Sequence, residues 1–320
     1  MNAIVIILLF LLGLVLIIKG GDYFVDAASW IAEVSGVPKF LIGATIVSLG
    51  TTMPELLVSL MASASGAIGI AVGNAVGSVT ANVGLIMGIS VVCIAAVINR
   101  KEMAFKFIMM AAAIGLLLAF SLGGSLSIAG SIVLLAMFLA YMVESVVGAR
   151  KAMKTDTGDP KPASDRRTVI VNIVKFFAGV AGIVIGARLM VDYGTALARL
   201  FGVPESIIGA TLVAVGTSLP ELVTTITAIV KKQSSLSIGN IVGANIIDLT
   251  LILPLCSVIS GKALPILRQN ILLDMPFCLA LILVAILPPL ITGRFHKLQG
   301  VAMLAVYAVY VTMLCTGVVA

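Results

Sequence analysis

The sequence has little charge, few aromatic residues and almost no histidine. Only 11% of its 320 residues are charged, 6% are aromatic, and His296 is the single histidine. Soluble domains carry about a quarter charged residues, and a soluble fold of this size cannot hide an apolar content of 61%. The composition therefore excludes a cytosolic enzyme, a secreted domain and a disordered chain, and it indicates that lipid is the solvent.

Neither a nucleic-acid surface nor a disulfide framework is indicated. The net charge of +6 comes from basic residues scattered between apolar segments, without a basic face or an aromatic platform. The cysteines lie within apolar runs, which is typical of buried thiols. They are Cys93, Cys256, Cys278 and Cys315.

Long apolar runs dominate the chain, whose mean hydropathy is +1.23. A helix needs about 20 mostly apolar residues to cross the bilayer, and the runs are continuous, unlike the alternating strands of a barrel. We predict an all-α membrane protein with ten transmembrane helices. The predicted spans are 3–19, 40–63, 70–98, 104–121, 126–148, 168–188, 205–230, 236–260, 271–292 and 298–318.

Basic residues favour one side of this arrangement. If the polar stretch between spans five and six is cytoplasmic, sixteen of the twenty Lys and Arg residues fall on the cytoplasmic side. We therefore predict a multi-pass protein of the plasma (cytoplasmic) membrane with both termini outside. The polar stretch, 150–167, is expected to be a cytoplasmic linker loop between two five-span halves, 1–149 and 168–320.

The two halves resemble each other at a constant offset of 166 residues. Between Gly36–Leu56 and Gly202–Leu222, 13 of 21 positions are identical, including a Pro-Glu pair in each. The segment Gly73–Gly77 recurs in the same way as Gly239–Gly243. Five spans is an odd number, so the second half must enter the membrane upside down. Such inverted repeats are the architecture of secondary transporters.

Three acidic residues lie deep in the predicted spans: Glu55, Glu221 and Asp248. Acids at this depth are costly and are usually functional. No Lys or Arg lies deep in a predicted span, so the three carboxyl groups have no fixed counter-charge. They must be protonated or must hold mobile cations, and this favours cation transport.

Oxygen-bearing groups surround these acids. Hydroxyl groups lie within about one helical turn of both glutamates; they belong to Thr51, Thr52, Thr217 and Ser218. Pro54 and Pro220 lack an N–H group, which frees a carbonyl oxygen four residues earlier. Carboxylate, hydroxyl and carbonyl oxygens are hard ligands that suit Ca²⁺ and Na⁺ rather than thiophilic metals.

The segments Gly-Thr-Thr-Met-Pro-Glu (50–55) and Gly-Thr-Ser-Leu-Pro-Glu (216–221) resemble the paired alpha repeats of the cation/calcium exchanger superfamily, and most closely its prokaryotic sodium/calcium exchangers. The resemblance covers essentially the whole membrane chain. It implies ten helices, outward termini and one alternating-access site between the halves. It also implies that spans one and six slide across the remaining helices during exchange. It implies that Glu55 and Glu221 ligate Ca²⁺. It also assigns to the cation sites Thr51, Thr52, Thr217, Ser218, Ser78, Asn82 and Asp248, with the backbone carbonyls of Ser48 and Ala214.

One position departs from the family pattern. Ser78 and Asn82 share a helix face, and their repeat equivalents are Ala244 and Asp248. Family members carry a hydroxyl group where this chain has Ala244, which leaves the sodium stoichiometry open. Asp248, opposite a neutral Asn82, is similar to the K⁺-dependent relatives and leaves K⁺ dependence open.

We predict a secondary active antiporter that exchanges Ca²⁺ for Na⁺ at a midplane site of oxygen ligands between the two repeats. Both ions are substrates and not cofactors, and no cofactor, catalytic residue or protein partner is indicated, so we do not expect an enzyme. A Ca²⁺/H⁺ exchanger and a K⁺-dependent exchanger are the alternatives. A passive channel does not need two equivalent halves, and an assembly factor would leave the buried acids unexplained.

Overall fold

The protein is almost entirely helical, as expected from the sequence. The structure is a computed structural model that describes residues 3–93, 100–155, 165–201, 216 and 218–316. The α-helices are α1 (Ala3–Ser35), α2 (Lys39–Ile42), α3 (Ser48–Thr51), α4 (Met53–Ala64), α5 (Ile68–Ala81), α6 (Gly88–Cys93), α7 (Arg100–Ser121), α8 (Ile128–Thr155), α9 (Arg166–Leu200), α12 (Leu219–Val230), α13 (Ser234–Ile247), α14 (Leu253–Ser260), α15 (Met275–Thr292) and α16 (Lys297–Thr316). Segments of π-helix occupy Gly43–Val47, Asn82–Met87, Asp248–Ile252 and Asn270–Asp274. Two short strands, β1 (Ser125–Leu126) and β2 (Leu264–Pro265), pair antiparallel.

Several of these segments can cross a membrane. Within the described ranges, eight continuous helices are long and apolar enough to do so, when a π-helical segment is counted together with the α-helices that it joins. A bent pair, Lys39–Thr51 and Met53–Ala64, makes a ninth; it bends by 45° just before Pro54, where the missing N–H interrupts the helical hydrogen bonds. The multi-span arrangement is thereby confirmed. Much of the predicted span 205–230 lies outside the described residues. The helix described within it is the 12-residue α12.

Two helices are longer than the spans predicted for them. Helix α1 has 33 residues and α9 has 35, against predicted spans of 3–19 and 168–188. A 33-residue helix is about 50 Å long, well beyond the roughly 30 Å hydrocarbon core. The prediction ended too early because Asp22 and Asp26 interrupt the apolar run. Both carboxylates lie one turn apart on α1, where the Lys231 ammonium group contacts them at 3.3 and 2.7 Å.

The predicted linker is also helical at both ends. Helix α8 continues to Thr155, and α9 begins at Arg166, so the two helices enter the range 150–167 from either side. The start of α9 has a local cause: the Asp165 carboxylate accepts a hydrogen bond from the Thr168 backbone N–H at 3.1 Å. This is an N-cap. Hydrogen bonding to the Thr168 hydroxyl, and next to the Thr168 backbone N–H, lowers the pKa of the exposed Asp165 carboxyl group.

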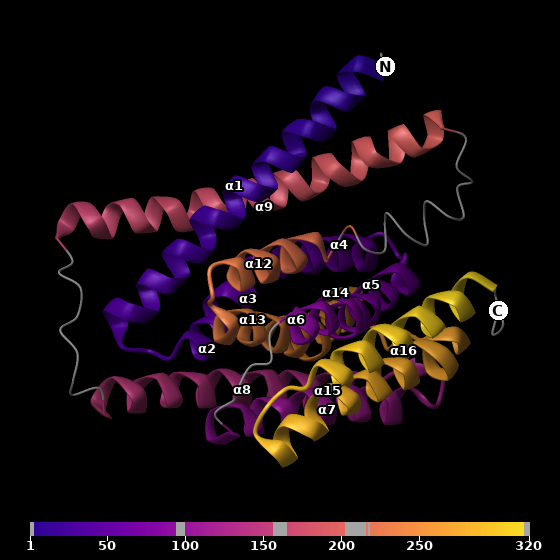
Figure 1. Cartoon of the computed structure of the whole chain (residues 1–320). Coiled ribbons are helices and arrows are strands. Elements are labelled where there is room, and N and C mark those ends of the chain that lie inside the picture. The colour runs from indigo at the N-terminus through magenta and orange to yellow at the C-terminus, as the bar shows by residue number, and fades with distance from the viewer. Residues whose placement is uncertain (1–2, 94–99, 156–164, 202–215, 217, 317–320) are drawn as a thin grey trace.

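The helices form three layers (Figure 1). Helices α1 and α9 cross on one side of a central group that includes α3, α4, α12 and α13, and α7, α8, α15 and α16 lie on the other side. Glycines allow the backbones of α1 and α9 to touch. A Cβ added at Gly20 would lie 2.9 Å from the Gly179 carbonyl oxygen, and one at Gly186 would lie 2.7 Å from the Gly13 carbonyl oxygen.

Where both repeats are described, they adopt the same secondary structure. Shifted by the repeat offset of 166 residues, the bounds of α4 coincide with those of α12, and the bounds of α5 with those of α13. A π-helical segment follows α5 at Asn82 and another follows α13 at Asp248, again at equivalent positions. The repeated sequence therefore produces repeated local structure, including its irregularities.

The first half and the second half meet closely in the central layer. Helix α2 and the π-helical segment after it pack against α13. A Cβ at Gly43 would lie 2.3 Å from the Leu236 carbonyl oxygen, and one at Gly239 would lie 2.2 Å from the Phe40 carbonyl oxygen. Since real Cβ contacts stay above about 3 Å, only glycine fits at either position. This contact brings the two Pro-Glu segments together.

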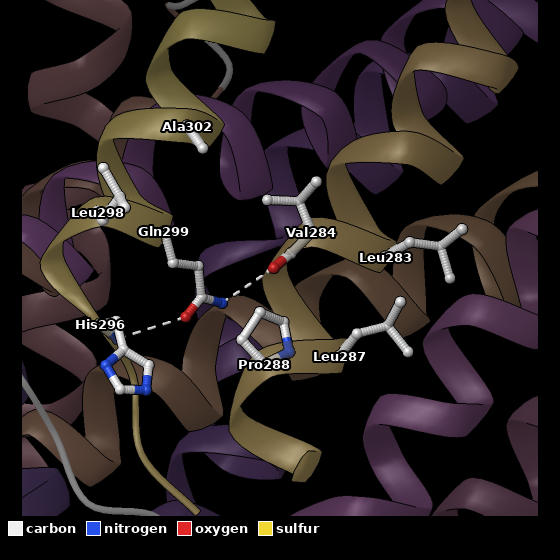
Figure 2. A pocket seen from close by; sticks show the side chains of 8 residues that line it. All are labelled: Leu283, Val284, Leu287, Pro288, His296, Leu298, Gln299 and Ala302. Atoms are coloured by element: carbon white, nitrogen blue, oxygen red, sulfur yellow. Dashed lines mark hydrogen bonds between the residues drawn. The ribbon is translucent and has the colours of Figure 1, made fainter. Parts of the chain in front are cut away.

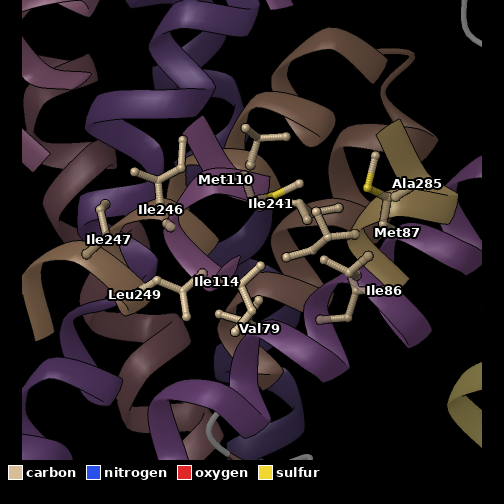
Figure 3. Packing of buried hydrophobic residues seen from close by; sticks show 14 of the residues in the cluster. Val79, Ile86, Met87, Met110, Ile114, Ile241, Ile246, Ile247, Leu249 and Ala285 are labelled. Carbon is tan, nitrogen blue, oxygen red and sulfur yellow. The ribbon is translucent and has the colours of Figure 1, made fainter. Parts of the chain in front are cut away.

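The apolar core extends through all three layers, and Figure 3 shows the part where the central layer meets α7 and α15. Lipid tails are as apolar as these side chains, so the core stabilises the fold mainly by close packing and less by removal from water. Its labelled members include Ile86, Met87, Met110, Ile114, Ile241, Ile246 and Ala285, all buried.

A glutamine compensates for two consecutive prolines in α15. Pro288 and Pro289 lack N–H groups, so the carbonyl oxygens of Val284 and Ala285 lose their helical donors. The Gln299 amide of α16 donates to both oxygens, at 3.0 and 2.7 Å. Figure 2 shows Gln299 reaching toward α15 across a mostly apolar pocket.

We expect Gln299→Leu to destabilise the protein by about 1–3 kcal/mol, because buried carbonyl groups would lose their donor. The measurement is the thermal unfolding temperature of the purified protein in detergent. Gln233→Leu, at a half-buried position just before α13, is the matched control. Equal unfolding temperatures for the two variants would contradict the role given to Gln299.

Candidate functional site

Glu55 and Glu221 occupy the same position in two equivalent helices. Each lies in the first turn of its helix, α4 or α12, directly after a proline. Proline is favoured at a helix start because its missing N–H is not needed there, and the N-terminal end of a helix is partially positive. Both glutamates are 1% exposed, and none of their four carboxylate oxygens has a hydrogen-bond partner in the structure. Both are therefore buried acidic side chains whose oxygens have no hydrogen-bond partner among the described residues.

Asn82 and Asp248 form a second equivalent pair. Each is the first residue of a π-helical segment, a feature that frequently marks functional positions. Asp248 is fully buried and both its carboxylate oxygens lack hydrogen-bond partners. The Asn82 amide donates to the Asn245 side-chain oxygen at 3.2 Å, and Ser78, one turn before Asn82, is also buried.

The predicted hydroxyl groups converge on the Ser48 carbonyl oxygen. It accepts a hydrogen bond from the Thr52 hydroxyl at 2.6 Å, and the Thr51 hydroxyl oxygen lies 3.4 Å from it. Both hydroxyl groups also lie beside the Glu221 carboxylate. The buried Ser218 hydroxyl has no partner. Residues of the first half thus approach the glutamate of the second half.

Two asparagines belong to this site that were absent from the predicted ligands. The Thr51 hydroxyl donates to the Asn240 side-chain oxygen at 3.1 Å, which links the two halves. The equivalent Asn74 donates to the Glu55 carbonyl oxygen at 3.3 Å and to the Ser59 hydroxyl at 2.9 Å. Both asparagines are in the repeated Gly-Asn pairs, so the repeat itself was the signal that could have identified them.

Nine of the eleven predicted ligands are described, and Thr217 and Ala214 lie outside the described residues. All nine are buried: Ser48, Thr51, Thr52, Glu55, Ser78, Asn82, Ser218, Glu221 and Asp248. The Glu55 carboxyl group is within electrostatic reach of Glu221 and Asp248. Over the described ranges, no three acidic, histidine or cysteine side chains surround one ion position.

Lys106, close to the start of a membrane-spanning helix, is a basic residue that the structure places inside the protein. This side chain in α7 is fully buried. Its charge is nevertheless matched locally, because Lys106 forms an ion pair with Glu144 of α8 and lies over the Tyr141 ring at 5.6 Å. Sequence placed it near a span end and could not show that α8 covers it. It does not neutralise the carboxylates of the candidate site.

The chemistry of the site is that of hard cations. Buried carboxylates need a positive partner, and the oxygens available here are those that bind Na⁺ and Ca²⁺. The site has neither an activated nucleophile nor an acid–base pair among its described residues.

Comparison with known proteins agrees with this chemistry. Residues 5–147 and 171–316 match the family described as sodium/calcium exchanger protein. The chain is 32% identical to the sodium/calcium exchanger MaX1 of Methanosarcina acetivorans, over 96% of this chain and 97% of that protein. It is 31% identical to a membrane protein of Methanocaldococcus jannaschii over the same shares.

A solved structure matches over the full fold. The sodium-calcium exchanger NCX_Mj has a TM-score of 0.82 to this chain at 29% sequence identity, covering 97% of this chain and 99% of that chain. Fold, site composition and relatives agree, and they show that this chain belongs to the sodium/calcium exchanger family, a family of membrane cation exchangers.

Proposed function

We propose that this chain is a secondary active antiporter that exchanges Ca²⁺ for Na⁺ at one site between its two halves. The observation that carries the proposal is the pair Glu55 and Glu221, two buried carboxylates without hydrogen-bond partners at equivalent helix starts. Two negative charges match one Ca²⁺, and the neutral oxygens nearby also suit Na⁺. MaX1 is a sodium/calcium exchanger, and NCX_Mj soaked with Na⁺ and Ca²⁺ has a similar fold.

Shared ligands would couple the two ion flows. Ca²⁺ and Na⁺ compete for the same carboxylates, so one load must leave before the other binds. An empty site would keep two uncompensated charges away from water, which is costly. The protein therefore changes conformation readily only when loaded, and exchange follows.

Alternating access follows from two inverted halves, 1–149 and 168–320, around the linker 150–167. The contacts between α1 and α9 support this symmetry. Gly13 is the repeat equivalent of Gly179, and Gly20 of Gly186, while Gly13 touches Gly186 and Gly20 touches Gly179. Such reciprocal contacts are what a two-fold axis generates.

We further propose that α1 and α9 slide across the remaining helices during exchange, with both termini outside and the linker in the cytoplasm. The two long helices cover one side of the central group (Figure 1). The excess of basic residues on the linker side supports the orientation.

The test is uptake of radioactive Ca²⁺ by vesicles containing the purified protein, with imposed Na⁺, H⁺ or K⁺ gradients. We expect an outward Na⁺ gradient to drive uptake and an H⁺ gradient alone to have no effect. Uptake driven by H⁺ without Na⁺ would replace the proposal with Ca²⁺/H⁺ exchange. Uptake without any gradient of a second cation would indicate a passive channel.

K⁺-dependent exchange is the second candidate, because Asp248 adds a third buried carboxylate where the first half has neutral Asn82. Two carboxylates already balance one Ca²⁺, so we expect Asp248→Asn to retain substantial Ca²⁺ exchange and to lose K⁺ sensitivity if wild type has any. The measurement is vesicle exchange with and without K⁺. Complete loss of exchange by a well-folded variant would show that the Asp248 charge is required.

The methyl group of Ala244 is expected to weaken a sodium site. Its repeat equivalent, Ser78, offers a hydroxyl group, whereas Ala244 is fully buried and offers none. A missing neutral ligand costs about 1–3 kcal/mol by analogy with unpaired buried groups, or about ten- to a hundredfold in affinity. Ala244→Ser should therefore lower the half-saturating Na⁺ concentration with little change for Ca²⁺. An unchanged Na⁺ titration, with or without K⁺, would remove Ala244 from the sodium site.

A further inference from the structure

A buried carboxyl group lies outside the candidate cation site. Asp274 ends the π-helical segment Asn270–Asp274 and is 4% exposed. One carboxylate oxygen accepts from the Asn270 amide at 2.7 Å, and the other accepts from the Tyr310 hydroxyl at 3.1 Å. The equivalent first-half position is Ile108, so this cluster has no counterpart in the duplicated ion chemistry.

Asp274 forms no ion pair with a basic residue in the described part of the chain. The titratable groups that face it are the Cys278 thiol, one turn along α15, and the Tyr310 hydroxyl of α16. The Tyr307 ring packs against the Tyr310 ring, with 6.2 Å between the ring centroids. Helix α5, which packs on the same segment, contains no titratable residue. Charge balance at Asp274 must therefore come from a small mobile cation or from a proton.

A metal cation needs a shell of several oxygen ligands, whereas a proton needs one acceptor oxygen. The two Asp274 oxygens accept from the Asn270 amide and the Tyr310 hydroxyl, and because these donors stabilise the charged carboxylate, a bound proton must change one of these hydrogen bonds. The Asn270 side-chain oxygen is buried and has no partner. Rotation of this amide by half a turn would present that oxygen to a protonated Asp274. Asn270 can thus donate to the charged carboxylate or accept from the neutral acid.

The residues just before the cluster are partly exposed. Arg268 is exposed and Gln269 is half-buried, immediately before Asn270. The same segment packs against α5, which carries Ser78 of the candidate cation site.

We propose that Asp274 and Asn270 form a proton-binding site, separate from the cation site, whose occupancy modulates ion exchange from the end of α15. The proposal that Asp274 binds a proton is argued from the local geometry alone. The proposal that this proton modulates ion exchange also rests on the proposed exchange function. Protonation reverses the direction of the hydrogen bond between Asp274 and Asn270, and this change is passed to α5 through direct packing.

Infrared spectroscopy of the full-length protein in lipid tests proton binding without transport. The spectra are titrated with pH at saturating Ca²⁺, and Asp274→Asn is compared with wild type. Asp192→Asn, an exposed aspartate on α9, is the control. We expect a carboxylic acid carbonyl band that disappears as the pH is raised and is lost in Asp274→Asn only. Absence of such a band, or a band that does not change with pH, would overturn the proposal.

Tyr310→Phe provides a second variant for the same measurement. It removes the hydroxyl group that donates to the charged carboxylate, so the acid band should persist to higher pH than in wild type. A band with the wild-type pH dependence would contradict the assignment to Asp274.

The modulation is tested separately by vesicle exchange over the same pH range. Asp274→Asn should lose the part of the pH dependence that follows the infrared titration, while Asp192→Asn keeps it. Identical pH profiles for the two variants would overturn the modulation while leaving proton binding intact. If wild type shows no exchange at any pH, the proposed function fails, and the infrared titration still decides on the proton site.

Discussion

Replacement of Glu55 or Glu221 by glutamine is expected to abolish Ca²⁺ exchange while the protein still folds and inserts. Each carboxylate is 1% exposed and unpartnered, so its charge is available only to a bound ion. Glutamine keeps the size and removes the charge. Loss of one partner of a buried ion pair costs about 3–5 kcal/mol, which is about two to four powers of ten in Ca²⁺ affinity.

Vesicle uptake and equilibrium Ca²⁺ binding are the measurements for both variants. Glu33→Gln is the matched control, because Glu33 is exposed and pairs with Lys39 at 2.9 Å. The control should bind and exchange Ca²⁺ as wild type does. Near-normal uptake by either purified site variant would refute the two-carboxylate site.

The second large effect is expected from a single methyl group at Gly239. Its Cβ would lie 2.2 Å from the Phe40 carbonyl oxygen, and the obstacle is backbone, which cannot rotate away as a side chain can. Overpacking a core costs about 1–3 kcal/mol and sometimes more. We expect Gly239→Ala to be near or above the upper end of this range.

Gly115→Ala is the control for this substitution. It lies within α7, and an added Cβ there meets nothing within 4 Å. Alanine is also the better helix former by about 1 kcal/mol, so this variant should unfold at the same temperature or higher. Thermal unfolding in detergent and the yield of folded protein are compared. A Gly239→Ala protein as stable as Gly115→Ala would show that the two halves do not meet as closely as described.

Gly239→Ala also probes the assembly of the site. The neighbouring residue, Asn240, accepts the hydrogen bond from Thr51 across the two halves. Any separation of α13 from α2 would therefore weaken both the packing and the ligand arrangement. Where the variant folds, its Ca²⁺ affinity should fall together with its stability.

Much of this protein could be predicted from local pattern. Apolar runs indicated the membrane helices because a bilayer requires about 20 apolar residues per span. The repeat indicated Glu55 and Glu221 because a buried acid is costly, and two equivalent ones are not retained by chance. Helix bounds were less predictable, since Asp22 and Asp26 interrupt the apolar run of α1 although Lys231 pairs with both.

Sequence by itself determined the helical membrane class, the repeated halves and the acids that lie within the spans, because each depends on residue type and spacing within one segment. Only the tertiary structure decided which segments meet. Asn240 accepts a hydrogen bond from Thr51, which is 189 residues away in the chain. Lys106 of α7 forms an ion pair with Glu144 of α8. Gln299 donates hydrogen bonds to carbonyl oxygens of α15 that lose their helical donors at two prolines. These contacts join distant segments through the packing of helices, and no local periodicity encodes that packing.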